Sequence, residues 1–366
     1  MTSRSSPPST ESEPTFLKAG LATYEYVRSL GQANHGELML ARQHYNGRFS
    51  GHAVLKRLNS VIREQDYHRI LEEGQLGGLL RHDNIVAVRH MEGTVDSPIL
   101  ILEYIQGHRL SELLALARRV GRPLPRELSC FVVAEVAEAL HHAHSCADEE
   151  GRSLEVVHRD VTPYNILISS RGEVKLADFG VAWSRLRGRM TSEGDNYPGS
   201  LAYSSPERTS LEHLDGRSDL FSLGVILLQL LTGVHLFDAS ERFEAELRSR
   251  QVRAWQELAR PSQLPGTQEM GAHRTRSLMR HIRGVTVDTI ASATRGLPEG
   301  LQPILRKALA PKRDNRYARG ADLSAALREY LWEGGHRFGR EVVAAQVAAL
   351  AEAAVRRLEG GTDSEP

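Results

Sequence analysis

Short apolar runs follow one another along the N-terminal part of the chain, from Tyr24 to about Glu103. The runs are "YEYVRSLG", "GELMLARQ", "HAVLKRL", "IVAVRHMEG" and "PILILEYI". Runs of this kind, bounded by glycine and polar residues, are typical of strands in an antiparallel sheet. A longer segment, "DYHRILEEGQLGGLLR", interrupts them with the apolar spacing of a helix. The pattern therefore predicts a small sheet accompanied by one helix.

Beyond Gly107 the apolar positions recur at every third or fourth residue, as in "LSELLALARRV" and "ELSCFVVAEVAEALHHAH". This spacing predicts amphipathic helices. The segment "FSLGVILLQLLTG" is apolar nearly all round, which is typical of a helix buried in the middle of a lobe. We therefore expect an α+β fold in two lobes, a small β-rich lobe and a larger helical one, with a hinge near Glu103 to Gln106.

Both ends of the chain differ from these lobes. The N-terminal "MTSRSSPPSTESEPT" lacks the apolar core of a signal peptide and is too polar to fold alone. Near the other end, charged residues interrupt "EVVAAQVAALAEAAVRRL" and predict an amphipathic surface helix. The expected organisation is a disordered segment over 1–22, an N-lobe with hinge over 23–106, a C-lobe over 107–334, and a helix with a disordered tail over 335–366.

The composition excludes some functions. Lys plus Arg equals Asp plus Glu, 46 against 46, so no overall field favours nucleic acid or an anionic membrane. The basic stretch "HRTRSLMRHIR" is better explained as a solvated helix face. The chain has only two cysteines, Cys130 and Cys146, and no apolar run long enough to cross a membrane. We expect a cytoplasmic protein without a membrane span.

Four stretches contain residues suited to phosphate and metal chemistry. "LGQANHGELMLA" places Gly31 and Gly36 in a turn where backbone N–H groups could approach phosphates, although an ordinary hairpin explains it equally well. "HAVLK" ends in Lys56 on a predicted strand. "HRDVTPYN" contributes Asp160 and Asn165, and "LADFG" follows with another aspartate, Asp178.

In this order and at these distances, the motifs resemble those of eukaryotic-type protein kinases over residues 24 to about 333. The sequence of these motifs is most similar to that of soluble bacterial serine/threonine kinases whose corresponding motif is HRDVSPxN. The resemblance implies a bilobal protein-kinase fold that uses ATP and Mg2+. It implies phosphate transfer to Ser and Thr hydroxyls of protein substrates, with autophosphorylation. We expect a regulatory partner or self-association, with the signal entering through a partner or through residues 240–297.

The resemblance also implies a role for individual residues. Lys56 would hold the α- and β-phosphates, and the spacing to "RHDNIV" favours Glu73 over Glu72 as its partner. Asp160 would orient the substrate hydroxyl and accept its proton. The implied catalytic residues are Lys56, Glu73, Asp160, Thr162 and Asn165, and the implied metal ligands are Asn165 and Asp178. The implied nucleotide-binding residues are Gly31, Gly36, Leu38, Ala53, Lys56, Leu102, Glu103, Ile105 and Leu167. The implied structural residues are Ser200, Glu207, Asp219 and Arg316.

The chain departs from the usual kinase pattern at two positions. Thr162 stands where serine/threonine kinases usually have Lys, and Ala33 replaces the middle glycine of the phosphate-binding turn. Both would suit a pseudokinase that acts as a regulatory binding module. Because the phosphate lysine, the catalytic aspartate and the magnesium ligands are all present, we favour an active enzyme. Tyrosine specificity is disfavoured, since no Ala-Ala-Arg follows Asp160 and Ser200 suits a hydroxyl-type substrate site.

Regulation is predicted in the segment between Asp178 and Glu207. Thr191 and Ser192 follow three arginines, and phosphate on either residue could bind Arg159 and order the segment. The alternative is that both hydroxyls are ordinary loop residues.

Two further features leave alternatives open. Gly74, Gly77 and Gly78 in the predicted helix could make it soft, or could allow close packing against strands. The group His141, His142, His144 and Cys146 could bind zinc, although kinases commonly end this helix with a His-rich run.

Overall fold

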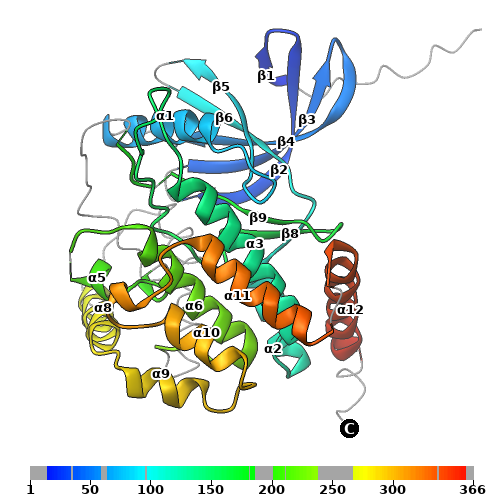
Figure 1. Cartoon of the computed structure of the whole chain (residues 1–366). Coiled ribbons are helices and arrows are strands. Elements are labelled where there is room, and N and C mark those ends of the chain that lie inside the picture. Colours follow the sequence, from blue (N-terminus) through cyan, green and yellow to red (C-terminus); the bar gives the residue numbers. More distant parts are fainter. Residues whose placement is uncertain are drawn as a thin grey trace, which may run out of the picture. The chain divides into compact units, whose positions relative to one another are not determined.

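The structure is a computed structural model that describes residues 15–33, 36–58, 64–94, 97–180, 182–185, 201–210, 212–237, 267–335 and 338–359. The chain divides into two compact units (Figure 1). The first unit comprises Met1–Gly78 and Ala87–Tyr104, and the second comprises Leu79–Val86 and Ile105–Pro366. The division at Tyr104 falls within the segment where the sequence places the hinge.

The first unit is a six-stranded antiparallel sheet with one helix, as the apolar runs predict. The strands are β1 (Thr15–Ala19), β2 (Ala22–Ala33), β3 (Gly36–Tyr45), β4 (Arg48–Leu58), β5 (Val88–Thr94) and β6 (Ser97–Glu103). They are arranged in the order β1-β2-β3-β4-β6-β5. The helix is α1 (Glu64–Leu79).

Strand β1 corrects the expected disordered segment 1–22. Residues 15–19 pair antiparallel with β2, and Leu17 and Ala19 pack against the buried core of the sheet. The polar residues before and within this strand concealed it, because an edge strand needs only one apolar face. The prediction of disorder is therefore wrong for residues 15–22.

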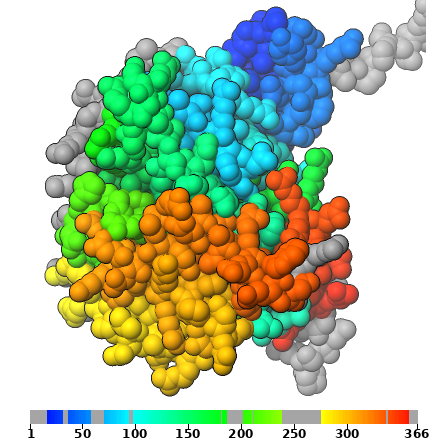
Figure 2. All heavy atoms as spheres, in the orientation of Figure 1, coloured from blue at the N-terminus to red at the C-terminus, as the bar shows by residue number. Residues whose placement is uncertain are grey.

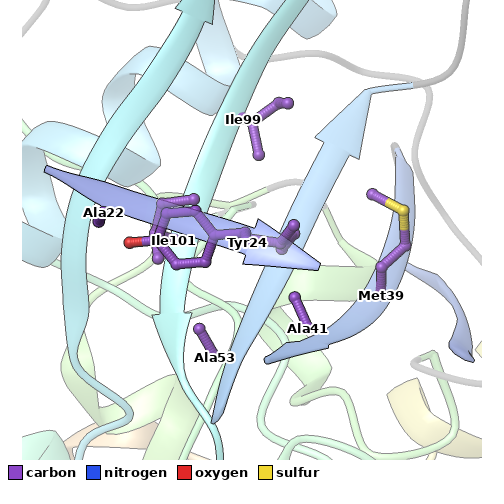
Figure 3. Close-up of a cluster of buried hydrophobic side chains, with 8 residues drawn as sticks. Ala22, Tyr24, Met39, Ala41, Ala53, Ile99 and Ile101 are labelled. Carbon is purple, nitrogen blue, oxygen red and sulfur yellow. The ribbon is translucent and has the colours of Figure 1, made fainter. Parts of the chain in front are cut away.

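The core of the first unit is built around Tyr24, which is completely buried (Figure 3). Ala41 and Ala53 lie directly opposite each other on β3 and β4, and their small side chains leave room for the aromatic ring. Ile99 and Ile101 on β6 complete the same face. Large and small residues on facing strands thus pack together in one buried cluster.

The glycines of α1 differ in what surrounds them. A Cβ on Gly77 would come within 2.1 Å of the Val88 side chain on β5, and one on Gly74 would lie 3.1 Å from Leu100 on β6. A Cβ on Gly78 would meet nothing within 4 Å. Close packing against strands therefore explains Gly77 and contributes at Gly74, whereas Gly78 has no packing role.

The second unit is mainly helical and carries a small three-stranded sheet in the order β7-β8-β9. The strands are β7 (Gly107–Arg109), β8 (Ile166–Ser169) and β9 (Val174–Leu176). The helices are α2 (Leu110–Val120), α3 (Arg126–His144), α5 (Pro206–Thr209), α6 (Gly216–Thr232), α8 (Thr267–Arg283), α9 (Val287–Thr294), α10 (Leu301–Ala308), the 3-10 helix η1 (Arg313–Asn315), α11 (Gly320–Glu333) and α12 (Arg340–Glu359).

Helix α6 is buried along nearly its whole length, which confirms the interpretation of "FSLGVILLQLLTG". It packs against α3 and α10, and α3 packs in turn against α11. Gly224 allows the close approach to α10 and the residue that follows it, because a Cβ there would lie about 3.0 Å from Leu309 and 3.1 Å from Ala308. A buried helix of this kind gives a rigid base for the residues at its N-terminus.

The segment Leu79–Val86 belongs with the second unit, although the sequence boundaries place it in the first lobe. Asn84 donates to Glu135 Oε2 on α3 at 2.8 Å and to the Val174 carbonyl at 2.9 Å. Arg328 of α11 donates to the other oxygen of Glu135 at 2.6 Å. These hydrogen bonds join residues distant in sequence, so no local pattern indicates them.

The C-terminal helix α12 lies against α2, with its buried face formed by Val343, Val347, Leu350 and Ala354. Arg357 near its end donates to the carbonyls of Arg119 and Val120 at the end of α2. The helix appears in red in Figure 2, and its exposed residues include Glu341, Glu352 and Arg356. Among the helices that the structure describes, none is long and apolar enough to cross a membrane.

Candidate functional site

Lys56 and Glu73 form a buried ion pair within the first unit. Lys56 lies on β4 next to Leu55, and successive side chains of a strand point to opposite faces. Leu55 enters the core of the sheet, so Lys56 faces α1. Its ammonium donates to both oxygens of Glu73, at 2.8 and 2.7 Å. The two residues are 4 % and 5 % exposed. Of the two glutamates that the sequence offered, the structure brings Glu73 to Lys56.

The second unit contains a loop whose backbone is held by Asp219, in the first turn of α6. The Asp219 carboxylate accepts the backbone N–H of His158 at 2.9 Å and that of Arg159 at 3.0 Å. Its Oδ2 also lies 2.8 Å from His144 Nε2 on α3. Burial alone would raise the pKa of Asp219, but the hydrogen bond from His144 and the neighbouring histidines hold that pKa below its ordinary value. The carboxylate therefore stays ionised as the anchor of the loop.

Two residues of this region adopt a left-handed backbone conformation. Arg159 has φ 67° and Asp178 has φ 65°. Such conformations are costly for residues other than glycine and persist only where the surroundings enforce them. For Arg159 the enforcing contact is the N–H that Asp219 accepts. The backbone is therefore bent immediately before Asp160, which fixes the direction of that side chain.

The two carboxylate oxygens of Asp160 have different surroundings. The Asn165 side-chain amide donates to the Asp160 carbonyl and to its Oδ2, both at 2.8 Å. The second oxygen, Oδ1, is buried and has no hydrogen-bond partner among the described residues. Burial, and next the charge of Asp178, raise the pKa of Asp160. A fixed carboxylate with one unused acceptor suits the orientation and deprotonation of an incoming hydroxyl group.

Asp178 and Asn165 offer the oxygen donors that Mg2+ prefers. The Asn165 amide nitrogen is directed to Asp160, which leaves its amide oxygen for a cation. Asp178 is close enough to Asp160 for the two negative charges to act on each other. A divalent cation would relieve this repulsion, so the donor set and the charge both fit magnesium.

Two types of comparison assign the chain to a family. The protein kinase domain model matches residues 24–323. The chain belongs to the protein kinase family. The kinase is 30 % identical over 328 residues to tyrosine-protein kinase MasK of Myxococcus xanthus, which covers 89 % of this chain and 46 % of that protein. It is 28 % identical to serine/threonine-protein kinase PknB of Mycobacterium leprae, over 83 % of this chain and 42 % of the relative.

The kinase spans about half the length of these curated relatives. Among solved structures, it is similar to the PknI kinase domain of Mycobacterium tuberculosis, with a TM-score of 0.54 and 22 % sequence identity. That match covers 86 % of this chain and 98 % of the PknI domain. At this identity the likeness shows the fold, and the fold is that of a protein kinase.

A second buried ion pair holds the end of the segment from Asp178 to Glu207, which corresponds to the activation segment of protein kinases. Arg316 donates through Nη1 and Nη2 to the two oxygens of Glu207, at 2.6 and 2.8 Å. Its Nε also donates to the Ala310 carbonyl at 2.8 Å, and its guanidinium lies 4.7 Å from the centre of the Phe221 ring. The structure thus brings together two of the residues that the resemblance implies to be structural, and their contact fixes α5 to the helical core.

The residues expected at the nucleotide lie in both units. Gly31 has φ 104° and pairs with Leu38, and Ala53 is fully buried opposite Glu103. Gly36 and Leu38 begin β3, and Leu102 lies on β6. Ile105 and Leu167 belong to the second unit, with Leu167 on β8. Their role in binding ATP stays a prediction.

Some predicted residues lie outside the part of the chain that the structure describes, namely Thr191, Ser192 and Ser200. The zinc alternative has no support within the described residues, where no group of three or more His, Cys, Asp or Glu forms a metal site. His144 instead contacts Asp219, and the His142 ring lies 5.1 Å from that of His82. The His144–Asp219 contact was missed, although the His-rich end of the helix could have indicated it.

Replacing Glu73 tests the buried pair in the first unit. Glu73→Gln exchanges a charged acceptor for a neutral one beside a buried ammonium, and losing such a partner costs about 3 kcal/mol. Glu72→Gln is the matched control on the same helix, where we expect a change within about 0.5 kcal/mol. Urea unfolding followed by circular dichroism measures both. Equal free energies of unfolding for the two variants would show that the pair contributes nothing.

Proposed function

We propose that this kinase transfers the γ-phosphate of ATP to Ser and Thr hydroxyl groups of proteins. The observation that carries the proposal is the hydrogen bonding and burial of the Asp160 carboxylate. Its carboxylate is held by Asn165, and its Oδ1 is a buried acceptor without a partner among the described residues. In a loop anchored by Asp219, this atom is the base that a hydroxyl nucleophile requires.

The reaction then follows from the groups present. The substrate hydroxyl oxygen bonds to the γ-phosphorus as the bond from that phosphorus to the bridging oxygen of ADP breaks. The hydroxyl proton passes to Asp160 Oδ1. Lys56, kept in place by Glu73, would hold the α- and β-phosphates, and Asn165 and Asp178 would hold magnesium. Bound magnesium supplies positive charge that neutralises the phosphate oxygens.

Catalytic activity is favoured over the pseudokinase alternative because each group needed for transfer is present in an ordered local setting. The Lys56–Glu73 pair is formed, and Asp160 is fixed by Asn165. Thr162 and Ala33 remain the only sequence features that favour a pseudokinase. Thr162 lacks the positive charge that a lysine would bring to the transferring phosphate, but both substitutions leave Lys56, the implied metal ligands and the catalytic base in the chain.

The acceptor residue has a second candidate. The Myxococcus xanthus relative is named a tyrosine-protein kinase, whereas the Mycobacterium leprae relative is named a serine/threonine-protein kinase. Ser and Thr are favoured, because the sequence lacks the Ala-Ala-Arg arrangement of tyrosine kinases after Asp160.

The need for ATP and the two free thiols, Cys130 and Cys146, support the cytoplasmic location that the composition predicts.

Phosphate transfer is tested with the purified full chain, radiolabelled ATP, magnesium and a general protein substrate. We expect labelled protein from the parent and a loss of at least about 10²-fold in Asp160→Asn, because the base is removed while the hydrogen bond to Asn165 can persist. Phosphoamino-acid analysis should find phosphoserine and phosphothreonine. Phosphotyrosine alone would overturn the acceptor assignment, and a parent as inactive as Asp160→Asn would support the pseudokinase.

Phosphorylation of the activation segment is the proposed switch. Arg159 Nε is buried and has no hydrogen-bond acceptor among the described residues, which supports a phosphate as its partner. Thr191→Ala combined with Ser192→Ala should therefore lower transfer to an added substrate, while mass spectrometry of the parent after incubation with ATP should find phosphate on one of the two. Unchanged transfer in the double variant would contradict this switch.

A further inference from the structure

Arg109 is an unusual residue for its place in the chain. It ends β7 and directly precedes α2, with an extended backbone at φ −72° and ψ 146°. This N-cap position favours Ser, Thr, Asp or Asn, whose side-chain oxygen accepts a free N–H of the first helical turn. A guanidinium has no acceptor atom, and a positive charge next to a helix N-terminus is unfavourable. No hydrogen bond of the Arg109 side chain caps α2, so the arginine needs another explanation.

The Arg109 side chain instead contacts the loop that contains Asp160. Its Nη1 donates to the backbone carbonyl of Tyr164 at 3.0 Å. The peptide group with this carbonyl also contains the N–H of Asn165, which donates to the Thr162 carbonyl at 3.0 Å. A peptide group is planar, so a hydrogen bond at each end fixes the orientation of the whole group. The contact therefore fixes the backbone immediately before Asn165.

The other polar groups of Asn165 are held within the same unit. Its backbone carbonyl accepts the N–H of Ala177, the residue before Asp178, at 2.8 Å. Its amide nitrogen donates to Asp160 Oδ2 at 2.8 Å. The amide oxygen is the group left for a cation, so its direction depends on how the backbone of Asn165 is held. Removing a partner that orients a metal ligand typically lowers metal affinity or activity by about 10- to 100-fold.

The loop is also joined to α2 by a contact that does not use the Arg109 side chain. The backbone N–H of Ser111 donates to the Pro163 carbonyl at 3.0 Å. Arg109 itself is held by its backbone, which pairs with Leu167 on β8 and donates to Glu112 Oε2 at 3.2 Å. Replacing the Arg109 side chain therefore removes its contact with the loop and keeps the frame around it.

We propose that Arg109 positions Asn165 to hold magnesium. It is a positioning residue that acts through the peptide group between Tyr164 and Asn165, and it takes no part in the transfer itself. This inference rests on the magnesium site of the proposed function and names a residue that sets the strength of that site. It also accounts for an arginine at a position where a capping residue would stabilise α2 better.

Arg109→Ser tests the inference, because serine can cap a helix but is too short to reach the Tyr164 carbonyl. Mn2+, a paramagnetic substitute for Mg2+, should bind about 10-fold more weakly to this full-length variant with a nonhydrolysable ATP analogue. Electron paramagnetic resonance measures the free Mn2+. In the transfer assay, the Mg2+ concentration for half the maximal rate should rise by about the same factor, and saturating Mg2+ should restore most of kcat.

The stability of the variant separates this role from a structural one. Tm without nucleotide should stay the same or rise in Arg109→Ser, since serine is the better N-cap. Arg122→Ser removes an exposed arginine just beyond the other end of α2, and as the matched control it should leave Mn2+ binding unchanged. If Arg109→Ser does not fold, Arg109→Gln is measured in its place, with weaker Mn2+ binding again expected and parental affinity contradicting the inference.

The remaining outcomes overturn either this inference or the proposed function. A lower Tm with unchanged affinity for Mn2+ would show that Arg109 is structural. A higher KM for ATP at unchanged metal dependence would show that Arg109 contacts the nucleotide directly. An active parent with the same Mn2+ affinity as Arg109→Ser rejects this inference alone. An inactive parent that still binds Mn2+ more tightly than Arg109→Ser rejects the proposed transfer and supports the role of Arg109 at the metal site.

Discussion

The carboxylate of Asp219 is the contact on which the catalytic part of this kinase depends. It accepts the backbone N–H groups of His158 and Arg159 and thereby fixes a conformation that the chain would otherwise avoid. Asp160 follows directly, so its direction is set by the hydrogen bonds of the two residues before it. Asp219 can serve in this way because α6 is buried along nearly its whole length and cannot shift. A rigid apolar helix thus carries the polar group that orders a loop.

Two buried ion pairs have the same purpose elsewhere in the chain. Lys56–Glu73 joins β4 to α1 in the first unit, and Glu207–Arg316 joins α5 to the segment before α11 in the second. Burying both charges of such a pair costs several kcal/mol, and apolar residues would often be at least as stable in their place. Their benefit is directional, because a bidentate contact fixes the orientation of both side chains. Each unit therefore places its functional groups through charge geometry, within a frame that apolar packing stabilises.

The sequence could predict those features that repeat or that have a fixed spacing. Alternating apolar runs located five of the six strands of the first unit, and an uninterrupted apolar stretch located α6. Strand β1 was missed because polar and apolar residues are mixed within it. Its strand conformation depends on antiparallel pairing with β2, which the local sequence does not show. The membership of residues 79–86 was missed because it rests on the hydrogen bonds of Asn84 to residues far along the chain.

The residues of the candidate site divide in the same way, into those that sequence spacing identifies and those that depend on tertiary contacts. Motif spacing identified Lys56, Asp160, Asn165 and Asp178, because kinase chemistry constrains those residues relative to their neighbours in sequence. The sequence left open whether Gly77 packs closely against a strand, as it does on Val88, because the same glycine also suits a soft helix. Residues that act through tertiary contacts leave no mark on local spacing.

The most direct measurement is the rate of phosphate transfer by Asp219→Asn, compared with the parent under the same conditions. This variant keeps the shape of the side chain but replaces its charge, so the amides of His158 and Arg159 lose an ionised acceptor. Misplacing a reacting group by about 1 Å can cost about 10²-fold in rate, and we expect a loss of that order in a protein whose circular dichroism spectrum is unchanged. Transfer at the parental rate by folded Asp219→Asn would contradict the claim that this carboxylate organises the loop that contains Asp160.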